Sequence, residues 1–586
     1  MTILQSLDRY YDRMAARGEA EAPGFSREKI SFAIVLSPEG EVRDVMDLRV
    51  ASGRKRVPVL HEVPAAVKRT AGILPNRLWD KTSYVLGRTA GEGRRTAEEH
   101  AAFKALHRDL LAGSDDLGLV ALARFLDAWD PAAFDAPPFS PEMLDTNIVF
   151  RLASELRFIH QREAAKRLLA AEAGEEAGEI CLVTGRRAPV QRLHATIKGV
   201  EGAQSSGASL VSFNLDAFAS YGKEQGANAP TSEAAAFRYG AALNRMLDRA
   251  SANRLRRPLG DTTVVFWADT ANSIDEKAAA AAEWLFGGVV DPPSEGKDDS
   301  QEAVKLHDAL KKVAELKPVA ELGVGVVPGT RFHVLGLAPN AARLAVRYWL
   351  EDSIDAFARQ LGRHYQALEL KPAPRGWKSP PSLRWLLAKT TALQEKFDNV
   401  PPLLAGEMTR AVLAGTPYPR TLLAAALIRL RAGDDPTSGW HAAVIKAHLS
   451  RQPFKEMLPV ALDPDHPSTA YQLGRLFAVL EQAQYTALLS VNASIADRYY
   501  GAASATPARV FGPLLRGLNT HISDARKRGR GGWIQPKVQE IMKRLPADLP
   551  KTLKLEDQGR FAVGYYHERA TRPTKADETE TKGDEA

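Results

Sequence analysis

The spacing of apolar residues divides the chain into a mixed first part and a helical second part. Residues 30–36 and 42–48 have the pattern of two short strands, and a turn signal at residues 38–41 separates them, which predicts a β-hairpin. Residues 260–268 are typical of a buried strand. From about residue 344, apolar residues recur at helical spacing almost to the end of the chain. We therefore expect an α+β protein, with a mixed α/β N-terminal domain followed by an α-helical C-terminal bundle.

Changes of composition predict four regions. The mixed α/β domain covers residues 1–340, a helical connecting region covers 341–456, and the C-terminal helical bundle covers 457–570. A proline-rich connector at residues 371–381 marks a break within the helical part. Residues 571–586 are acidic and lack apolar side chains, so we expect them to be disordered.

Helices are expected wherever apolar residues recur every three to four positions. A short amphipathic helix begins the chain around Leu4–Met14, and two helices share residues 96–129, with a break at 113–116. Further strands are expected at residues 147–158, 179–185 and 324–337. Further helices are expected at residues 161–173, 234–250, 301–316, 382–396, 403–414, 420–432, 439–450, 468–493, 509–526 and 536–545.

Two polar loops flank a short predicted strand in the N-terminal half. The glycine loop (residues 198–208) has three glycines around Gln204, Ser205 and Ser206, and it begins at Lys198. The predicted strand covers residues 210–215. The second polar loop (residues 220–228) follows, and it contains Lys223, Gln225 and Asn228.

Amides and hydroxyls both donate and accept hydrogen bonds, so these loops suit base edges or a sugar-phosphate backbone. A tight turn rich in small residues is the plainer interpretation of the glycines. The spacing from Gly202 to Gly207 has the length of a Walker loop, but Ala208 stands where that motif needs a lysine, which argues against a nucleotide hydrolase.

Two further stretches combine cations with aromatic rings. Residues 68–87 interleave lysines and arginines with Trp79 and Tyr84 around a Pro-Asn turn. The basic cluster (Arg526, Lys527, Arg528 and Arg530) lies close to Trp533. Such interleaving is typical of nucleic-acid contacts. The alternative for residues 68–87 is a solvated basic loop with Trp79 in the core.

Charge and cysteine content narrow the classes of function. The chain has 586 residues, which is enough for two to four domains, and a net charge of +7, which admits nucleic acid as a partner. Cys181 is the only cysteine, so neither an internal disulfide nor a cysteine-based zinc site is expected. The first residues lack an apolar signal segment, and no stretch is apolar enough to span a membrane. We expect a cytoplasmic protein without membrane contact.

No arrangement of residues typical of catalysis stands out. The motifs G-x-S-x-G, H-E-x-x-H and C-x-x-C are absent, and His307–Asp308 is a lone pair without a second histidine at metal spacing. His194 is expected to be a hydrogen-bonded core histidine, and Cys181 an inert buried thiol. We expect a binding protein with no catalytic residue, no metal and no cofactor, and not an enzyme.

Six motifs in this order resemble the large subunit of the type I-C CRISPR Cascade surveillance complex. They are LQSLDRYY (4–11), PNRLWDKTSYVLG (75–87), CLVTG (181–185), KGVEGAQSSGA (198–208), SYGKEQ (220–225) and GDTTVVFWA (260–268). The resemblance implies a subunit that reads the protospacer-adjacent motif on double-stranded DNA, promotes duplex opening and R-loop formation, and supports recruitment of a helicase-nuclease, while guide pairing reads the remaining target. The partners it implies are the target duplex and its displaced non-target strand, the crRNA, the backbone and crRNA-processing Cascade subunits, a small subunit and the helicase-nuclease.

The resemblance also suggests roles for particular residues. The DNA and motif contacts are expected at Asn76, Lys81, Lys198, Gln204, Ser205, Ser206, Lys223, Gln225 and Asn228. The non-target strand is expected along Arg526, Lys527, Arg528 and Arg530. Within these sets, lysines and arginines would hold phosphates, and amides and hydroxyls would approach base edges.

A small subunit made by internal translation of the same reading frame is a further family feature. Met457 is a suitable start, because it follows a linker and precedes a self-contained helical unit. Two other functions stay open: a metal-dependent nuclease or nucleotide hydrolase of an antiviral defence system, and a scaffold that binds only the guide RNA.

Overall fold

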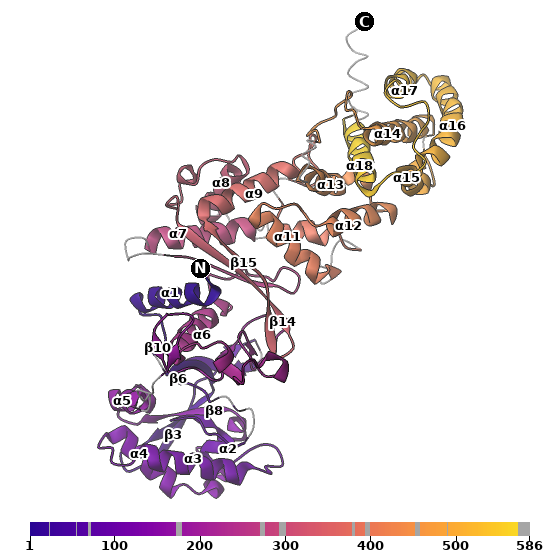
Figure 1. Cartoon of the computed structure of the whole chain (residues 1–586). Helices are drawn as coiled ribbons and strands as arrows, with labels where there is room; N and C mark the ends of the chain where they lie inside the picture. Colours follow the sequence, from indigo (N-terminus) through magenta and orange to yellow (C-terminus); the bar gives the residue numbers. More distant parts are fainter. Residues whose placement is uncertain are drawn as a thin grey trace. The chain divides into compact units, whose positions relative to one another are not determined.

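The chain folds into two compact units, and each of them contains both helices and strands (Figure 1). Unit 1 comprises Met1–Ile197 and Ser209–Arg245, and unit 2 comprises Lys198–Ala208 and Met246–Ala586. The computed structural model describes residues 1–22, 24–53, 55–67, 69, 72–171, 178–269, 276–291, 301–377, 381–392, 399–451, 458–488 and 490–571. Met457 and the predicted acidic tail from residue 572 lie outside the described residues.

A four-stranded mixed sheet, in the order β3-β2-β8-β7, forms the centre of unit 1. The predicted hairpin is confirmed: β2 (Phe32–Leu36) pairs antiparallel with β3 (Val42–Asp47). The apolar strand β8 (Asn147–Leu152) lies parallel to β2, and the two-residue strand β7 (Asp80–Lys81) pairs with the start of β8. Asp80 and Lys81, at the end of the stretch 75–81, are thereby fixed to the edge of the sheet.

Helices α3 (Thr96–Leu110) and α4 (Leu117–Ala128) cover one face of this sheet, as Figure 1 shows. Phe103, Leu122 and Phe125 from these helices pack against Ile34 and Phe150 of the strands. Asp116 begins α4 by accepting hydrogen bonds from the N–H groups of its first turn, which explains the break between the two predicted helices. Two shorter helices complete this layer, α2 (Thr82–Val85) and α5 (Glu163–Ala171).

Paired short strands and two further helices complete unit 1. The helix α1 (Ile3–Ala16) starts with a capping box between Thr2 and Gln5, and Asp8 forms an ion pair with Arg238 of α6 (Glu233–Leu247). The remaining strands of this part are β1 (Phe25–Ile30) with β6 (Val59–Pro64), β4 (Val50–Ser52) with β5 (Lys55–Val57), β9 (Glu179–Ile180) with β10 (Arg187–Ala188), and β11 (Thr196–Ile197).

Unit 2 begins with three antiparallel strands and the helices that cover them. The strand β14 (Arg331–Asn340) lies between β13 (Thr263–Ala268) and β15 (Arg343–Ser353). Phe266, Phe332 and Val334 meet apolar residues of α7 (Glu276–Val290), α8 (Gln301–Ala314) and α9 (Ile354–Leu368) in one core. The helices α10 (Leu383–Ala388), α11 (Pro402–Ala414), α12 (Arg420–Arg431) and α13 (Trp440–Ser450) follow.

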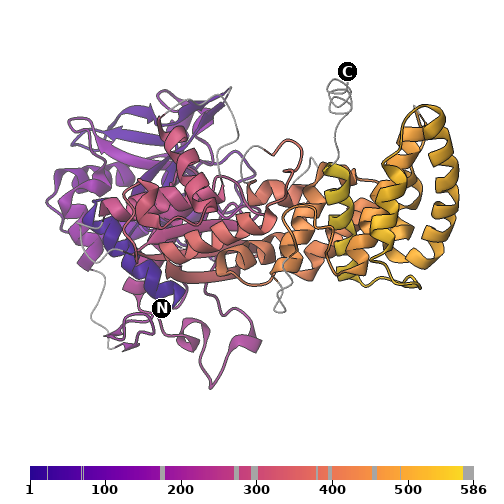
Figure 2. The same cartoon turned by 90° about the horizontal axis from the view of Figure 1, so that it is seen from above.

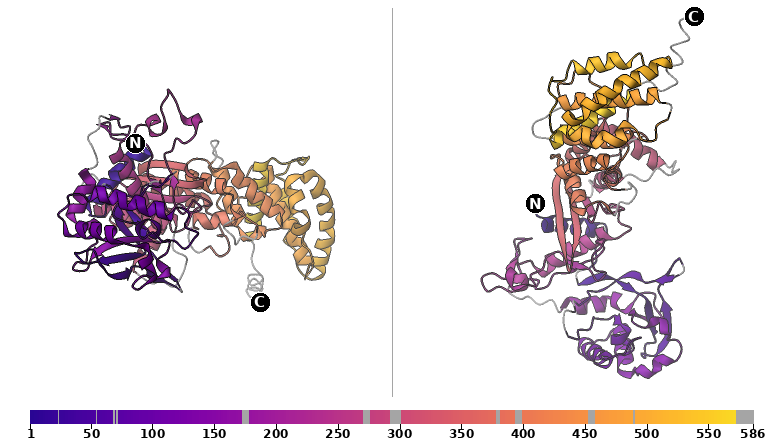
Figure 3. Two further views of the ribbon diagram at one scale, coloured as in Figure 1. Left: turned by 90° about the horizontal axis from the view of Figure 1, so that it is seen from below. Right: turned by 90° about the vertical axis from the view of Figure 1, so that its right-hand side faces the viewer.

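The C-terminal helices gather around α14 (Thr469–Ala487), which is buried on nearly all sides (Figures 1 and 3). Arg475 of α14 is fully buried, and it pairs with Glu540 (2.8 Å) and Glu568 (3.0 Å), so it joins three helices. The helices around α14 are α15 (Ile495–Ala505), α16 (Pro507–Lys527), α17 (Ile534–Met542) and α18 (Leu555–Ala570). Among the described residues, no helix combines the length and the apolar character that a membrane span needs.

The α+β class is confirmed, but several predicted elements are wrong or too long: the strand expected at 179–185 ends at Ile180 (β9), and the helix expected at 382–396 ends at Ala388 (α10). Residues 210–215 form no strand: Leu215 is exposed and Val211 and Phe213 are only half-buried, so they make no buried face, and the short strand β12 (Ala208–Ser209) precedes them. Residues 344–353 are a strand instead of a helix, because their alternating side chains pair with β14. The helix expected at 468–493 ends at Ala487, and a capping box between Ser494 and Asp497 starts α15. The helices α7 and α18 were missed. The predicted boundary at residue 340 falls in the turn between β14 and β15.

Candidate nucleic-acid interface

The Pro-Asn loop (residues 75–81) of unit 1 is held by buried side chains. The carboxylate of Asp80 has no exposed surface and accepts hydrogen bonds from the backbone N–H groups of Asn76 (2.8 Å) and Lys81 (2.8 Å). It also pairs with the guanidinium of Arg69. Burial raises the pKa of Asp80, while the positive charge of Arg69 opposes that rise.

A histidine beneath the loop fixes Leu78, whose backbone has the left-handed φ of +62°. The N–H of Leu78 donates to Nε2 of His107 (2.8 Å), so the other ring nitrogen, Nδ1, carries a proton and donates to the carbonyl of Phe103 (2.8 Å). Burial lowers the pKa of His107 to about 4, and the ring is therefore neutral at pH 7.

Asn76, a predicted DNA contact, lies in the interior. It is 4% exposed, and its Oδ1 accepts a hydrogen bond from the N–H of Val67 (2.9 Å). Trp79 is also buried, with Nε1 donating to the carbonyl of Pro64 (2.7 Å), so the core interpretation of Trp79 holds. Both side chains therefore support the loop from the interior.

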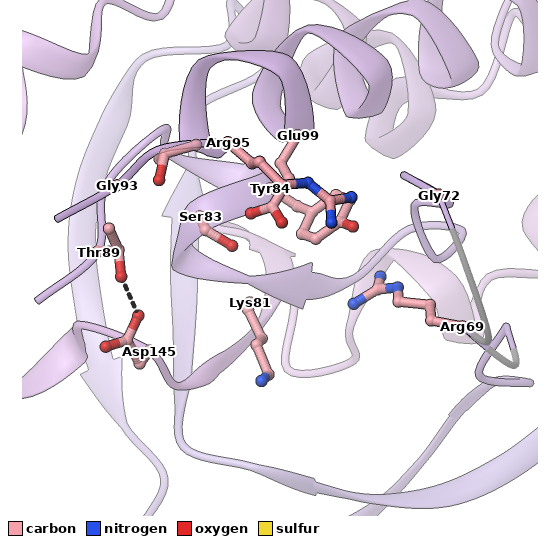
Figure 4. Close-up of a pocket in the computed structure, with 11 residues that line it drawn as sticks. Arg69, Gly72, Lys81, Ser83, Tyr84, Thr89, Gly93, Arg95, Glu99 and Asp145 are labelled. Carbon is pink, nitrogen blue, oxygen red and sulfur yellow. Dashed lines mark hydrogen bonds between the residues drawn. The ribbon is translucent and has the colours of Figure 1, made fainter. Parts of the chain in front are cut away.

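A cavity of about 500 Å³ opens beside the loop, where Lys81 is exposed (Figure 4). Three cations, Arg69, Lys81 and Arg95, line it, together with the acids Glu99 and Asp145. Arg69 lies over the ring of Tyr84 at 4.1 Å from its centroid, and Figure 4 shows Lys81 between Arg69 on one side and Asp145 on the other. Burial raises the pKa of Tyr84, while the charge of Arg69 opposes the rise.

Lys81 and Arg95 leave their charges available to a ligand. Neither side chain has an ion pair or a hydrogen bond in the part of the chain that the structure describes. Arg69, in contrast, is held by Asp80, Tyr84 and the carbonyl of Leu74 (Nε to O, 2.7 Å). The cavity thus combines one fixed cation with two that can reach phosphate oxygens.

The glycine loop belongs to unit 2 and exposes the residues at its tip. Gln204, Ser205 and Ser206 are exposed, and the N–H of Gly207 closes the turn onto the carbonyl of Gln204 (2.9 Å). At the base of the loop, Gly199 has a φ of +87°, and a Cβ on it would stand 2.7 Å from the carbonyl oxygen of Leu247. Only glycine fits there without strain.

Two further contacts fix the glycine loop in unit 2. The N–H of Glu201 donates to Oγ1 of Thr263 (3.0 Å), and the carboxylate of Glu201 pairs with Arg254 (3.3 Å). Lys198 is half-buried at the start of the loop. The polar tip is therefore presented on a supported backbone.

The second polar loop lies in unit 1, and its predicted contacts are in part structural. Asn228 accepts a hydrogen bond from the N–H of Ser220 and donates to the carbonyls of Lys223 and Gln225. Gln225 accepts from Nε of Arg192 (2.7 Å). Lys223 is about half exposed, and its Nζ lies 3.6 Å from a carboxylate oxygen of Glu179.

The basic cluster lies at the turn between α16 and α17 of unit 2, and all four of its side chains are exposed. Arg526 donates to Gln535 (2.7 Å), and Lys527 pairs with Asp524 (3.1 Å). Arg528 and Arg530 have no ion pair among the described residues. A groove of about 650 Å³ runs between the two helices beside Arg526 and Lys527.

His194 and Cys181 occupy the core as predicted. His194 is buried, and its Nδ1 lies 2.6 Å from the hydroxyl of Tyr239. Cys181 is buried, and its sulfur accepts a hydrogen bond from the N–H of Ser232 (3.2 Å). Among the described residues, no three His, Cys, Asp or Glu side chains gather as a metal would need.

Three residues with a place in the candidate surfaces were not predicted from the sequence: Arg95 and Asp145, which line the cavity, and Tyr221, which is fully exposed. Arg95 lies fourteen positions after Lys81, and Asp145 reaches the same cavity from the segment before β8, so no local pattern joins them. Tyr221 was part of a recognised motif, but nothing in the motif distinguishes an exposed ring from a buried one.

A family model described as CRISPR-associated protein (Cas_Csd1) matches residues 7–572 of the chain. No curated protein matches it. The match covers both units, and it includes every residue of the loops and of the basic cluster described above.

Proposed function

Because the chain belongs to the CRISPR-associated Csd1 family, which makes it a component of a Cascade-type CRISPR system, we propose that it is the large subunit of a type I-C surveillance complex. In this role it recognises the protospacer-adjacent motif on double-stranded DNA, promotes duplex opening and R-loop formation, and supports recruitment of the helicase-nuclease. The complex around it holds the crRNA, the backbone and crRNA-processing subunits, and a small subunit.

One observation supports motif reading above the others: the exposed Gln-Ser-Ser tip of the glycine loop. A carboxamide can form a bidentate pair with one base edge, which is worth about 1–3 kcal/mol of discrimination against the wrong base. The side chains of Gln204, Ser205 and Ser206 have no hydrogen bond among the described residues, and the backbone that carries them is fixed by Thr263 and Arg254. Groups that are free in a supported loop suit base readout.

Phosphate contacts are proposed at two cationic surfaces. Lys81 and Arg95, beside the fixed guanidinium of Arg69, would hold a DNA phosphate at the unit 1 cavity. Arg526, Lys527, Arg528 and Arg530 would hold the displaced non-target strand at the unit 2 turn. Such contacts add affinity without sequence information, and they weaken as salt rises.

The test compares binding of the assembled complex to duplexes with the motif intact or scrambled. Gln204→Ala should lose roughly five- to a hundredfold of the discrimination between them, as expected for one lost bidentate pair. The matched control Gln301→Ala removes another exposed glutamine of unit 2 and should change nothing. Discrimination that survives in Gln204→Ala, Ser205→Ala and Ser206→Ala alike would contradict motif reading by this loop.

Phosphate contacts by the basic cluster would show in the salt dependence of binding instead of in motif discrimination. A double variant Arg528→Gln/Arg530→Gln should weaken binding to both duplexes equally and reduce the slope of log K against log salt by about one per lost contact. An unchanged slope would remove the basic cluster from the DNA surface.

We also propose that the chain binds nucleic acid without cleaving it. Incubation of the purified chain with labelled DNA and Mg²⁺ or Mn²⁺ tests the nuclease alternative, and product formation would contradict our proposal. Affinity for motif-bearing duplex compared with crRNA alone tests the alternative of a guide-only scaffold.

A further inference from the structure

The tip of the second polar loop is a two-residue turn with an aromatic residue in an unusual backbone conformation. The N–H of Lys223 donates to the carbonyl of Ser220 (2.9 Å), and φ is +52° at Tyr221 and +68° at Gly222. Positive φ at both central positions defines a type I′ turn. Gly222 adopts this conformation freely, but tyrosine does so only against steric repulsion from its Cβ.

The turn is held in place by one amide. Oδ1 of Asn228 accepts a hydrogen bond from the N–H of Ser220 (2.9 Å), and its Nδ2 donates to the carbonyls of Lys223 (3.0 Å) and Gln225 (3.1 Å). Both ends of the turn are thereby tied to one side chain. Figures 2 and 3 show the magenta, loop-rich segment of this region projecting from the helices of unit 1.

The ring of Tyr221 contributes nothing to the fold that the structure describes. Tyr221 is 100% exposed, whereas most other tyrosines of the described chain are buried or half-buried. A single exposed ring is ordinary, but a tyrosine held at positive φ in a supported turn is not, and neither the turn nor the core needs a tyrosine there, so the position points to a contact outside the chain.

We propose that Tyr221 is a base-stacking residue whose ring packs on an unpaired base of the nucleic acid that the complex binds. The inference rests on the proposed function only in taking nucleic acid as the ligand. A ring can stack only on a base face that no neighbouring base covers, so the target is a single strand or a strand junction. Lys223, two residues after Tyr221 and about half exposed, supplies a cation for the same strand, although its Nζ also lies 3.6 Å from Glu179.

The surroundings of the ring favour a base over a protein pocket. A tyrosine that anchors a protein interface sits at the centre of a patch that excludes water. Here the neighbours are Ser220 and Gly222, the cation Lys223 and the acid Glu224, and all of them are exposed, so no apolar patch surrounds the ring. Stacking on a base needs only the two flat faces, and water can surround the rest.

The turn itself provides a variant that removes the ring without breaking the fold. Asparagine is the residue preferred at this position of a type I′ turn, so Tyr221→Asn should melt at or above the temperature of the unchanged chain. Tyr221→Phe keeps the ring and removes the hydroxyl. Tyr499→Asn removes another partly exposed tyrosine, on α15, and serves as the matched control.

The experiment uses the purified full chain and a single-stranded oligonucleotide that contains the fluorescent base 2-aminopurine, whose emission falls when an aromatic ring stacks on it. We expect quenching with the unchanged chain, Tyr221→Phe and Tyr499→Asn, and loss of quenching with Tyr221→Asn. The affinity of Tyr221→Asn for the strand should fall roughly five- to a hundredfold, as for the loss of one stacked base.

Equal quenching and equal affinity in Tyr221→Asn and the unchanged chain would overturn the proposal. So would a Tyr221→Asn chain that binds the strand normally but fails to assemble with its partner subunits, since the ring would then be a protein contact. Loss of motif discrimination in Gln204→Ala together with no effect of Tyr221→Asn would reject the stacking role alone. Absence of binding to both duplex and single strand by the unchanged chain would reject both proposals.

Discussion

Two loops with similar sequence signals have opposite arrangements of their side chains. The Pro-Asn loop of unit 1 turns its characteristic residues inward: Asn76 and Asp80 are buried, and each forms hydrogen bonds with backbone N–H groups. The glycine loop of unit 2 turns its characteristic residues outward, with Gln204 and Ser205 exposed at the tip. In the first loop side chains hold the backbone, and in the second glycines and backbone contacts hold the side chains.

The difference teaches that a polar residue in a motif has two quite different uses. A buried carboxylate or amide that satisfies N–H groups is costly to remove, because the donors it leaves behind are desolvated. An exposed amide can be removed with little effect on stability, because water replaces its contacts. Stability and binding measurements should therefore separate the two loops.

The largest effect is expected from Asp80→Ala. This change leaves the N–H groups of Asn76 and Lys81 without an acceptor and Arg69 without its carboxylate. The free energy of unfolding should therefore fall by roughly 3 kcal/mol. Urea unfolding and hydrogen exchange at the Asn76 and Lys81 amides would measure it. The control Asp145→Asn, at an exposed carboxylate of the same cavity, should shift the midpoint little. Equal effects of the two changes would contradict a structural role for Asp80.

Acid should loosen the Pro-Asn loop before the glycine loop. The folded pKa of His107 is about 4, below the ordinary value near 6.5, so the unfolded chain binds the proton more readily between these values. The contribution of neutral His107 to stability is complete above pH 6.5 and is lost as pH falls towards 4. At pH 5 the free energy of unfolding should be lower by about 2 kcal/mol.

Hydrogen exchange of the Leu78 and Gly207 amides, corrected for intrinsic pH dependence, would follow the two loops separately. Protection of Leu78 should fall between pH 7 and 5 while protection of Gly207 changes less, because no histidine holds the glycine loop among its described contacts. His107→Gln should flatten the pH dependence of Leu78. An unaltered slope in this variant would assign the acid sensitivity to another group.

A smaller effect is expected from Gly199→Ala at the base of the glycine loop. The methyl group would require a positive φ from alanine and would crowd the carbonyl of Leu247, so unit 2 should lose about 1–2 kcal/mol. Ser205→Ala, at the exposed tip, should change thermal stability by less than about 0.5 kcal/mol. A Gly199→Ala chain that melts like the unchanged chain would show that the base of the loop is not fixed.

Much of the fold follows from local patterns. The β2–β3 hairpin, the pair α3 and α4, and the helices α11 to α14 all begin within a few residues of the predicted positions, since each has an apolar stripe, and α14 also begins at a capping residue, Ser468. The strand β15 was missed because Leu344 and Tyr348 lie four positions apart, as on one face of a helix, whereas Leu344, Val346 and Tyr348 together alternate as in a strand; pairing with β14 decides between the two.

The candidate site was predicted less completely. The exposed tip of the glycine loop and the exposed basic cluster agree with expectation in their accessibility, and their contacts with DNA stay a prediction. Asn228 was predicted to bind DNA, but its carboxamide is occupied in holding the turn that carries Tyr221. The cavity beside Lys81 needs Arg95 and Asp145, which come from separate segments and share no sequence signal.

The sequence by itself determined where most helices and strands form and which loops are rich in glycine, cations and amides, because those properties depend on neighbours along the chain. Only the tertiary structure decided which polar side chains face inward and which face water, because burial depends on segments far apart in sequence. Asn76 and Tyr221 illustrate both sides: the amide became a support for the backbone, and the ring, the larger apolar group, was left in solvent at the tip of a strained turn.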